Sequence, residues 1–153
     1  MKTLPELHNL TSYPQRIVCL TEETTETLYL LGEGRRVVGI SGYTVRPKEA
    51  RQKPKVSSFI KANYDKILTL EPDLVFAFSD LQANLVAELI RRGVTVCAFN
   101  QRSVREILQM ILAIGRLIGC ETKANELVTR LVGELQAIAS SAARFPRRSK
   151  RLR

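Results

Sequence analysis

The chain has 153 residues, of which 44% are hydrophobic and 25% charged, a balance that predicts a single soluble domain with a hydrophobic core. The formal net charge is +9, but six Lys and Arg residues lie in the last ten positions, so the rest carries only 9 − 6 = +3. This distribution argues against a nucleic-acid-binding domain, and we expect the terminal RFPRRSKRLR to be a solvated, disordered tail.

Few residues have the potential to bind a metal ion. Cys19, Cys97 and Cys120 are far apart and lie in apolar runs, so we expect buried thiols rather than disulfides or metal ligands. His8 is the only histidine, which leaves a zinc site with too few ligands. We therefore expect no metal centre.

The N-terminus does not have the pattern of a secretory signal. Pro5, Glu6, His8 and Asn9 interrupt the run of about 7–15 apolar residues that such a signal requires. The chain also lacks an uninterrupted run of about 18 apolar residues, the length that a membrane-spanning helix needs. As written, the sequence is expected to be cytoplasmic.

Strand and helix patterns alternate along the chain. The apolar run RIVCL predicts a strand at residues 16–20. The following TEETTETLYLLGEG predicts a helix with Thr21 as its N-cap and Gly32 or Gly34 at its end. A second strand is predicted at residues 36–41.

The connection at residues 42–58 is rich in Pro, Gly and Lys and is too polar for a regular element, so this long loop is a candidate for function. Two helical turns are predicted at residues 63–70, followed by a third strand at residues 74–78. Residues 79–92 predict a helix whose apolar face comprises Leu81, Leu85, Leu89 and Ile90. A fourth strand follows at residues 95–99.

Two further helices complete the pattern. The first follows Ser103 and has apolar residues at helical spacing, namely Ile107, Met110, Ile111, Ile114 and Leu117. The second spans residues 121–143 and carries an apolar seam of Leu127, Leu131, Leu135 and Ile138.

Apolar strands joined by helical crossovers predict a parallel sheet that is covered on both faces. The expected fold class is therefore α/β, a three-layer open sandwich with a four-stranded parallel sheet, followed by a long C-terminal helix. Ligands of such sheets bind at the loops that leave the carboxyl ends of the strands. These loops are residues 21–25, 41–46, 57–63, 79–82 and 100–103.

The sequence lacks the motifs of common enzymes and nucleotide-binding domains. It has no G-x-G-x-x-G, no Walker G-x-x-x-x-G-K, and no G-x-S-x-G with a partner histidine. Glu22, Glu23 and Glu26 could serve acid–base chemistry, but the helix dipole favours carboxylates at a helix start in any case. We expect no catalytic residues and no resident cofactor.

Three stretches of the sequence together resemble one known family. They read RIVCLTEETTETLYLLGEGRRVVGISGYTVRPKEA, KPKVSSFIKANYDKILTLEPDLVFAF and RRGVTVCAFNQRSVREILQMILAIGRLIG. Their order, from about Arg16 to Ala143, is similar to the N-terminal lobe of the solute-binding proteins of ABC importers for cobalamin, ferric siderophores and haem.

The resemblance implies a protein of two α/β lobes, joined by a rigid helix, that holds its ligand between them. Residues 1–15 would then be an N-terminal extension, 16–120 the solute-binding lobe, 121–143 the connecting helix, and 144–153 the basic tail. The chain ends where the family begins its second lobe, so we expect a truncated or frame-shifted half of a binding protein. The family is periplasmic, which contrasts with the cytoplasmic location expected from the N-terminus.

The resemblance also implies ligand-binding residues. In the cobalamin-binding members, aromatic side chains from three loops face the corrin, and the matching positions here are Tyr43, Phe59 and Phe78. Asn100, in the loop after the fourth strand, is the fourth candidate. The expected ligand is a macrocycle or metal chelate, namely cobalamin, a ferric siderophore or haem, because flat rings stack well on such molecules. For Phe78, core packing at the end of a strand is the alternative.

Asp65 matches an acidic surface residue that pairs, in the family, with arginines of the membrane permease. We therefore predict that Asp65 is a permease-docking residue, and the alternative is a helix-start charge without a partner. Asp73 is expected to cap or turn the chain at the start of its strand.

Two functions are compatible with this sequence. The first is non-enzymatic ligand binding, as half of a cobalamin- or iron-chelate-binding protein of an ABC uptake system. The second is a cytoplasmic single-lobe interaction or carrier module, which would self-associate as a homodimer through residues 121–143 because one lobe cannot cover their apolar seam. No nucleic-acid partner is expected.

Overall fold

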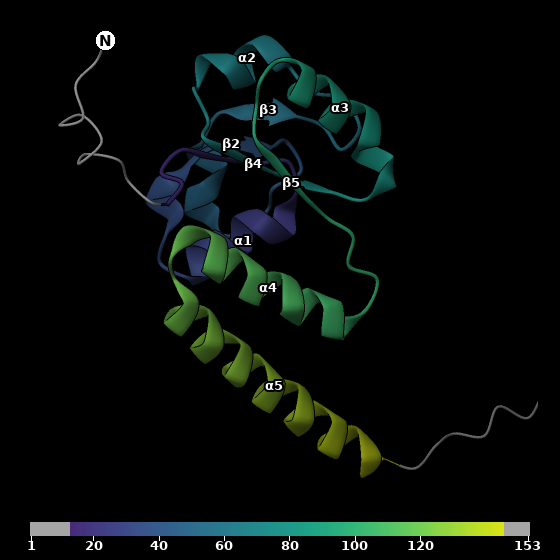
Figure 1. The fold of residues 1–153 in the computed structure, drawn as a ribbon. Coiled ribbons are helices and arrows are strands. Elements are labelled where there is room, and N and C mark those ends of the chain that lie inside the picture. Colours follow the sequence, from purple (N-terminus) through teal and green to yellow (C-terminus); the bar gives the residue numbers. More distant parts are fainter. Residues whose placement is uncertain (1–12, 146–153) are drawn as a thin grey trace, which may run out of the picture.

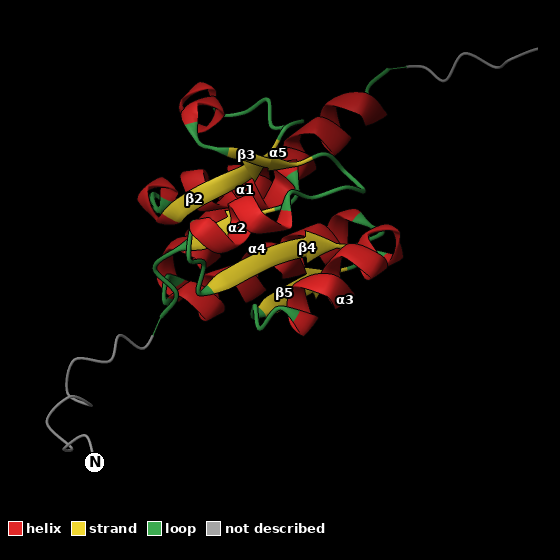
Figure 2. Ribbon diagram, turned by 90° about the horizontal axis from the view of Figure 1, so that it is seen from above, coloured by secondary structure: helices red, strands yellow, loops and turns green. Residues whose placement is uncertain are grey.

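The structure, a computed structural model, describes residues 13–145, which form an α/β sandwich around one parallel sheet (Figures 1 and 2). The strands are β1 (Ile17–Cys19), β2 (Val37–Ser41), β3 (Lys55–Ser57), β4 (Leu74–Phe78) and β5 (Val96–Phe99). The helices are α1 (Glu22–Leu30), α2 (Tyr64–Thr69), α3 (Ala83–Arg91), α4 (Val104–Ile118) and α5 (Glu121–Ala143). The predicted fold class and the long C-terminal helix are confirmed. The predicted N-terminal extension and basic tail lie mostly outside the described residues.

The predicted strand count was wrong, because the sheet has five strands in the order β3-β2-β1-β4-β5. The additional strand, β3, lies in the connection at residues 42–58 that was expected to hold no regular element. It pairs in parallel with β2, with Ile40 opposite Lys55 and Ser41 opposite Ser57. Only Val56 of its three residues is apolar and buried. A short strand at the edge of a sheet needs little apolar surface, so its sequence pattern is weak.

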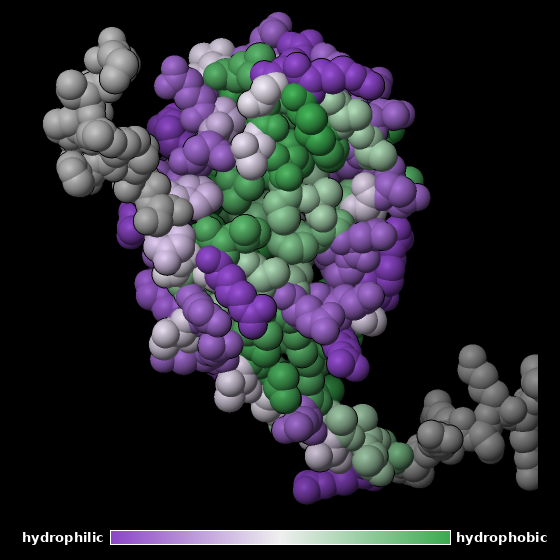
Figure 3. All heavy atoms as spheres, in the orientation of Figure 1, coloured by the Kyte–Doolittle hydropathy of each residue, from purple (hydrophilic) through white to green (hydrophobic). Residues whose placement is uncertain are grey.

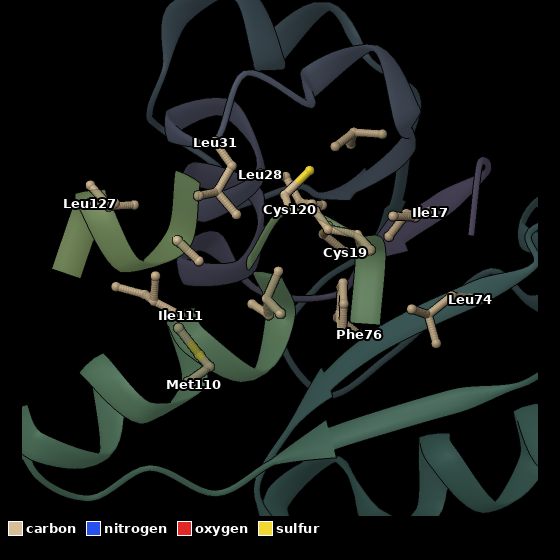
Figure 4. Packing of buried hydrophobic residues seen from close by; sticks show 14 of the residues in the cluster. Ile17, Cys19, Leu28, Leu31, Leu74, Phe76, Met110, Ile111, Cys120 and Leu127 are labelled. Atoms are coloured by element: carbon tan, nitrogen blue, oxygen red, sulfur yellow. The ribbon is translucent and has the colours of Figure 1, made fainter. Parts of the chain in front are cut away.

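Helices cover both faces of the sheet, and two separate hydrophobic clusters result. On one face α1, α4 and α5 pack against Ile17 and Cys19 of β1 (Figures 1 and 4). On the other face α2 and α3 pack against Val18 of β1 and against Leu20, two residues further along the chain. Successive strand residues point to opposite faces, so a strand covered on both sides is apolar without interruption, as residues 17–20 are.

The segment after β4 departs from the predicted continuous helix. Ser79 has a φ of +59°, a 3₁₀ turn follows at Asp80–Gln82, and α3 begins only at Ala83. Leu85 and Leu89 are buried as predicted, but Leu81 and Ile90 are 60% and 58% exposed, so their placement on the apolar face was wrong. The turn carries Gln82 into the interior instead.

A close crossing joins α4 to α5. Gly119 ends α4 with a left-handed φ of +75°, and a Cβ added at Gly115 would lie 2.3 Å from the Cβ of Ala124. From this crossing α5 runs away from the sheet, and exposure rises along the predicted seam. Leu127 is 5% exposed, whereas Leu135 and Ile138 are 42% and 64% exposed. Figure 3 shows hydrophobic surface that continues from the body of the lobe onto this helix.

A buried charge cluster lies at the amino ends of the strands. The Glu33 carboxylate forms an ion pair with Arg36 at 2.9 Å, and it accepts a hydrogen bond from the Cys120 thiol at 3.4 Å. Arg36 also donates to the carbonyl of Ile118, at 2.7 Å. Burial alone would raise the pKa of Glu33, but the Cys120 hydrogen bond and the neighbouring cations outweigh burial and lower it. The cluster fixes the start of β2 to the end of α4.

The cysteines are free thiols, as predicted. Cys19 and Cys120 are buried, and Cys97 is half-buried. Burial raises the pKa of Cys19 to about 12, so this thiol stays protonated at neutral pH. None of the helices within residues 13–145 is both long and apolar enough to cross a membrane.

Candidate functional site

The candidate site lies at the carboxyl edge of the sheet, next to the point between β1 and β4 where the strand order changes direction and on its β1–β2 side. From β1 the chain proceeds to β2 and β3 on one side, and then returns to β4 and β5 on the other. In open α/β sheets, ligands bind in the crevice beside such a reversal. The loops after β1 and β4 are therefore neighbours at the point where a ligand is expected.

A cavity of about 340 Å³ occupies this edge beside β1 and β2. Its lining consists of Leu20, Thr21, Glu22, Glu23, Ser41, Tyr43 and Phe59. These residues come from the segment after β1 and the first turn of α1, from the end of β2 and the loop after it, and from the loop after β3. The structure thus brings together two of the predicted ligand residues, Tyr43 and Phe59, which are 16 positions apart in the sequence.

Local hydrogen bonds shape the loop that carries Tyr43. The amide of Thr44 donates to the carbonyl of Ser41 at 3.1 Å, and the amide of Tyr43 donates to the Ser41 hydroxyl at 3.3 Å. This turn leaves the Tyr43 side chain 59% exposed at the rim of the cavity. Phe59 is half-buried and also lines the cavity. An exposed ring in an ordered turn is available to stack on a ligand.

The other two predicted ligand residues lie outside this cavity. Phe78 stands opposite Phe99 in the register of β4 and β5, and the guanidinium carbon of Arg102 lies 5.9 Å from its ring centroid. Asn100 lines a second cavity of about 280 Å³, between the end of β5 and α4. Both residues are at the carboxyl edge, but each has surroundings separate from those of Tyr43.

Two carboxylates line the Tyr43 cavity. From the sequence alone, both were interpreted as charges that favour the start of a helix. Glu22 and Glu23 occupy the first turn of α1, and both are exposed. None of the residues that line the cavity is basic. The site therefore combines aromatic walls with negative charge, an arrangement that favours neutral ligands rich in hydrogen-bond donors, or cations.

Gln82 is a further residue that was not assigned to the site from the sequence. Its side chain is fully buried, and its amide hydrogen-bonds the loops after β1, β3 and β4. In the sequence it appears as a polar residue between apolar positions of an expected helix. Without knowledge of the turn at Ser79, no signal indicates that it points inward.

Asp65 lies apart from the cavity, in the first turn of α2. Its side chain is 94% exposed, and its Oδ1 lies 3.3 Å from Nη1 of Arg92. The N-cap of α2 is Asn63, whose side chain accepts a hydrogen bond from the amide of Lys66 at 3.0 Å. Asp65 is therefore a surface carboxylate with one local partner, and its docking role stays a prediction.

Asp73 ties the chain before β1 to the start of β4. Its carboxylate accepts hydrogen bonds from the amides of Gln15 and Arg16, at 2.7 and 2.9 Å. Within residues 13–145, no group of three or more His, Cys, Asp or Glu side chains is arranged to hold a metal ion.

Residues 17–152 match the family described as periplasmic binding protein. An uncharacterised ABC transporter substrate-binding lipoprotein of Bacillus subtilis is 35% identical over 133 residues, which cover 84% of this chain and 42% of that protein. A cobalamin-binding protein of Halobacterium salinarum is 30% identical over 135 residues, which cover 86% of this chain and 37% of that protein.

The fold is also similar to solved structures. A possible iron-binding periplasmic solute-binding protein from Staphylococcus epidermidis superposes with a TM-score of 0.81 at 26% identity, over 89% of this chain and 54% of that one. The chain thus spans about half the length, or less, of the proteins that it matches. It belongs to the periplasmic binding protein family, and its residues 13–145 form one α/β lobe with a long helix after it.

Proposed function

We propose that this chain binds a cobalamin-type macrocycle without catalysis, as the N-terminal half of a solute-binding protein of an ABC uptake system. The observation that carries the proposal is the joint lining of one carboxyl-edge cavity by Tyr43 and Phe59, from two separate loops. Two rings on different loops can hold a planar ligand between or against them, and they lose few rotatable bonds on binding.

The charge of the cavity supports cobalamin among the three ligand classes of the family. Glu22 and Glu23 line it, and no basic side chain does. The corrin periphery carries amide groups, which can donate hydrogen bonds to carboxylates. Haem carries two propionates and many ferric siderophores carry anionic oxygens, so both meet like-charge repulsion here. Haem and ferric siderophores are therefore the less favoured ligands.

The volume of the cavity predicts weak binding by this chain. About 340 Å³ is at the small end of the range for ligand pockets, so one lobe contacts only part of a macrocycle. A dissociation constant in the micromolar range or weaker is expected. Phe78 and Asn100 would contact the ligand only where it extends past the Tyr43 cavity.

The proposal includes the mode of action of the chain, its macromolecular partner and its location in the cell. The chain acts by binding rather than by catalysis, and its macromolecular partner is the permease of an ABC importer, which Asp65 would contact. Its relatives favour the uptake role over a cytoplasmic carrier module. The matching family is described as periplasmic, so a periplasmic location belongs to the proposal, and cell fractionation would test it against the cytoplasmic one.

Titration of cyanocobalamin and haemin into the purified chain tests this function. Cyanocobalamin should bind more tightly than haemin, and Tyr43→Ala or Phe59→Ala should each weaken it roughly tenfold, the scale of one lost stacking contact. Phe145→Ala is the matched control, because Phe145 is an aromatic residue 75% exposed beyond the end of α5. Equal affinity of the wild type and both cavity variants, or tighter binding of haemin, would contradict the proposal.

A further inference from the structure

Gln82 hydrogen-bonds three separate segments at the carboxyl edge of the sheet. Its Nε2 donates to the carbonyl of Phe59 at 2.8 Å and to that of Leu20 at 3.3 Å. Its Oε1 accepts from the amide of Phe78 at 2.8 Å. One side chain therefore joins the segment after β3 to the ends of β1 and β4.

The hydrogen bonds also determine the orientation of the Gln82 amide. Two carbonyl oxygens face its nitrogen, and one backbone N–H faces its oxygen. The reverse orientation would place oxygen against two carbonyls and nitrogen against an N–H, so all three contacts would be repulsive. Both amide hydrogens and the acceptor are in use, which is the condition for burying this group at 0% exposure.

The backbone before Gln82 is arranged to put it there. Ser79 adopts a φ of +59°, uncommon for a residue with a side chain, and its amide donates to the carbonyl of Phe99 at 2.7 Å. The 3₁₀ turn that follows buries Gln82 and exposes its neighbour Leu81. Strained backbone of this kind persists when the surrounding structure holds it, and it is concentrated at functional sites.

The bond to Phe59 matters because of where that residue lies. The segment 57–62 closes on itself through the amide of Ser58, which donates to the carbonyl of Lys61 at 2.9 Å. Phe59 stands at the tip of this closed loop and forms a wall of the Tyr43 cavity. The Gln82 bond anchors the tip to the body of the lobe.

We propose that Gln82 is the positioning residue of the ligand site: its buried amide holds the Phe59 loop and the end of β4 in the one arrangement that forms the aromatic cavity. The role in ligand binding rests on the function proposed above. The role in ordering the loop does not, and it can be measured without a ligand.

The ligand-free test uses NMR on the full chain. In Gln82→Met, which keeps the length of the side chain, exchange of the Phe78 amide hydrogen should accelerate at least tenfold. The amide of Val75, at the other end of β4 and bonded to the carbonyl of Thr95, should change much less. The backbone order parameters of Phe59 and Ile60 should fall from rigid to flexible values.

Leu89→Val controls for a general loss of stability, since Leu89 is buried in α3 and makes none of these bonds. It should leave the Phe78 amide and the Phe59 loop as in the wild type. Equal effects of both variants, an unchanged Phe78 amide in Gln82→Met, or a wild-type loop that is already flexible would overturn the positioning role.

A binding measurement separates this inference from the proposed function. Gln82→Met should weaken cyanocobalamin binding about as much as Phe59→Ala, and it should add little in the Phe59→Ala background, because both act through one ring. Fully additive effects would contradict action through Phe59. If the wild type binds no cyanocobalamin, the proposed ligand is wrong, and the exchange and relaxation data alone decide the role of Gln82.

Discussion

Glu33 shows how a single buried carboxylate can link several elements of this lobe. Besides Arg36 and Cys120, the side chains of Arg35 and Lys123 lie within 3.3 and 3.6 Å of its oxygens. Removing one partner from a buried ion pair leaves the other charge uncompensated. We predict that Glu33→Gln lowers the free energy of unfolding by roughly 3 kcal/mol at neutral pH.

The effect of Glu33→Gln should also depend on pH. The folded state lowers the pKa of Glu33 from its ordinary value of 4.5, so its contribution is complete above that pH. The difference between wild type and variant should shrink as the pH falls below 4.5 and through the lowered pKa. Urea unfolding at pH 7 and at pH 3 measures both quantities. A difference that stays constant between them would contradict this account.

Asp65 yields a prediction about partner binding rather than stability. Its pair with Arg92 is exposed, so Asp65→Asn should leave the free energy of unfolding nearly unchanged. If Asp65 docks on the permease, the same change should weaken association of a two-lobe form with its permease, most strongly at low salt. Glu126→Gln, an exposed acid on α5, is the control. Equal affinity of Asp65→Asn and wild type at both low and high salt would remove the docking role.

At the residue scale, aromatic residues in polar loops were easier to select as site candidates than buried polar residues. Tyr43 and Phe59 stand in polar loops, where an apolar side chain indicates a site, and the structure places both in one cavity. Gln82 was missed because its role depends on the positive φ of Ser79, and a serine in the sequence does not indicate a positive φ. The charge of the cavity was missed because Glu22 and Glu23 have a sufficient local reason for their position.

At the scale of elements, the crossing of α4 and α5 can be tested with two glycines. A Cβ at Gly115 would lie 2.3 Å from Ala124, whereas nothing lies within 4 Å of a Cβ at Gly133 of α5. We predict that Gly115→Ala destabilises the lobe by about 1–3 kcal/mol through overpacking. Gly133→Ala should stabilise it by about 0.5–1 kcal/mol, the gain in helix propensity. Thermal unfolding of both variants measures this, and a stabilised Gly115→Ala would contradict the crossing.

Element prediction succeeded for the four strands with apolar runs and failed for the short edge strand β3. The strands β1, β2, β4 and β5 were predicted from their apolar runs, and α5 was predicted with its observed bounds, Glu121–Ala143. The edge strand β3 buries one side chain, Val56, and is defined mainly by its hydrogen bonds to β2. Such pairing depends on the tertiary fold, so the residue types of the strand alone do not predict it.

For the whole molecule, the distal half of α5 raises the question of self-association. Leu135 and Ile138 are exposed on a helix that extends away from the sheet, and an open apolar stripe recruits a partner. We predict that this chain forms a dimer of two copies through α5, and that Leu135→Gln with Ile138→Gln abolishes it. Light scattering after size exclusion measures the mass, with the exposed Glu134→Gln as control. A monomer at high protein concentration would refute the dimer.

The proposed binding of a corrin ring in the carboxyl-edge cavity of Tyr43 and Phe59 can be observed residue by residue. The most direct test is to add cyanocobalamin to the ¹⁵N-labelled chain and to map which amide signals shift. We expect shifts in residues 20–23, 41–44 and 57–61, the segments that line the cavity, and none around Glu33 and Cys120 at the opposite edge. Shifts confined to that opposite edge or to α5, or no shifts at millimolar ligand, would contradict it.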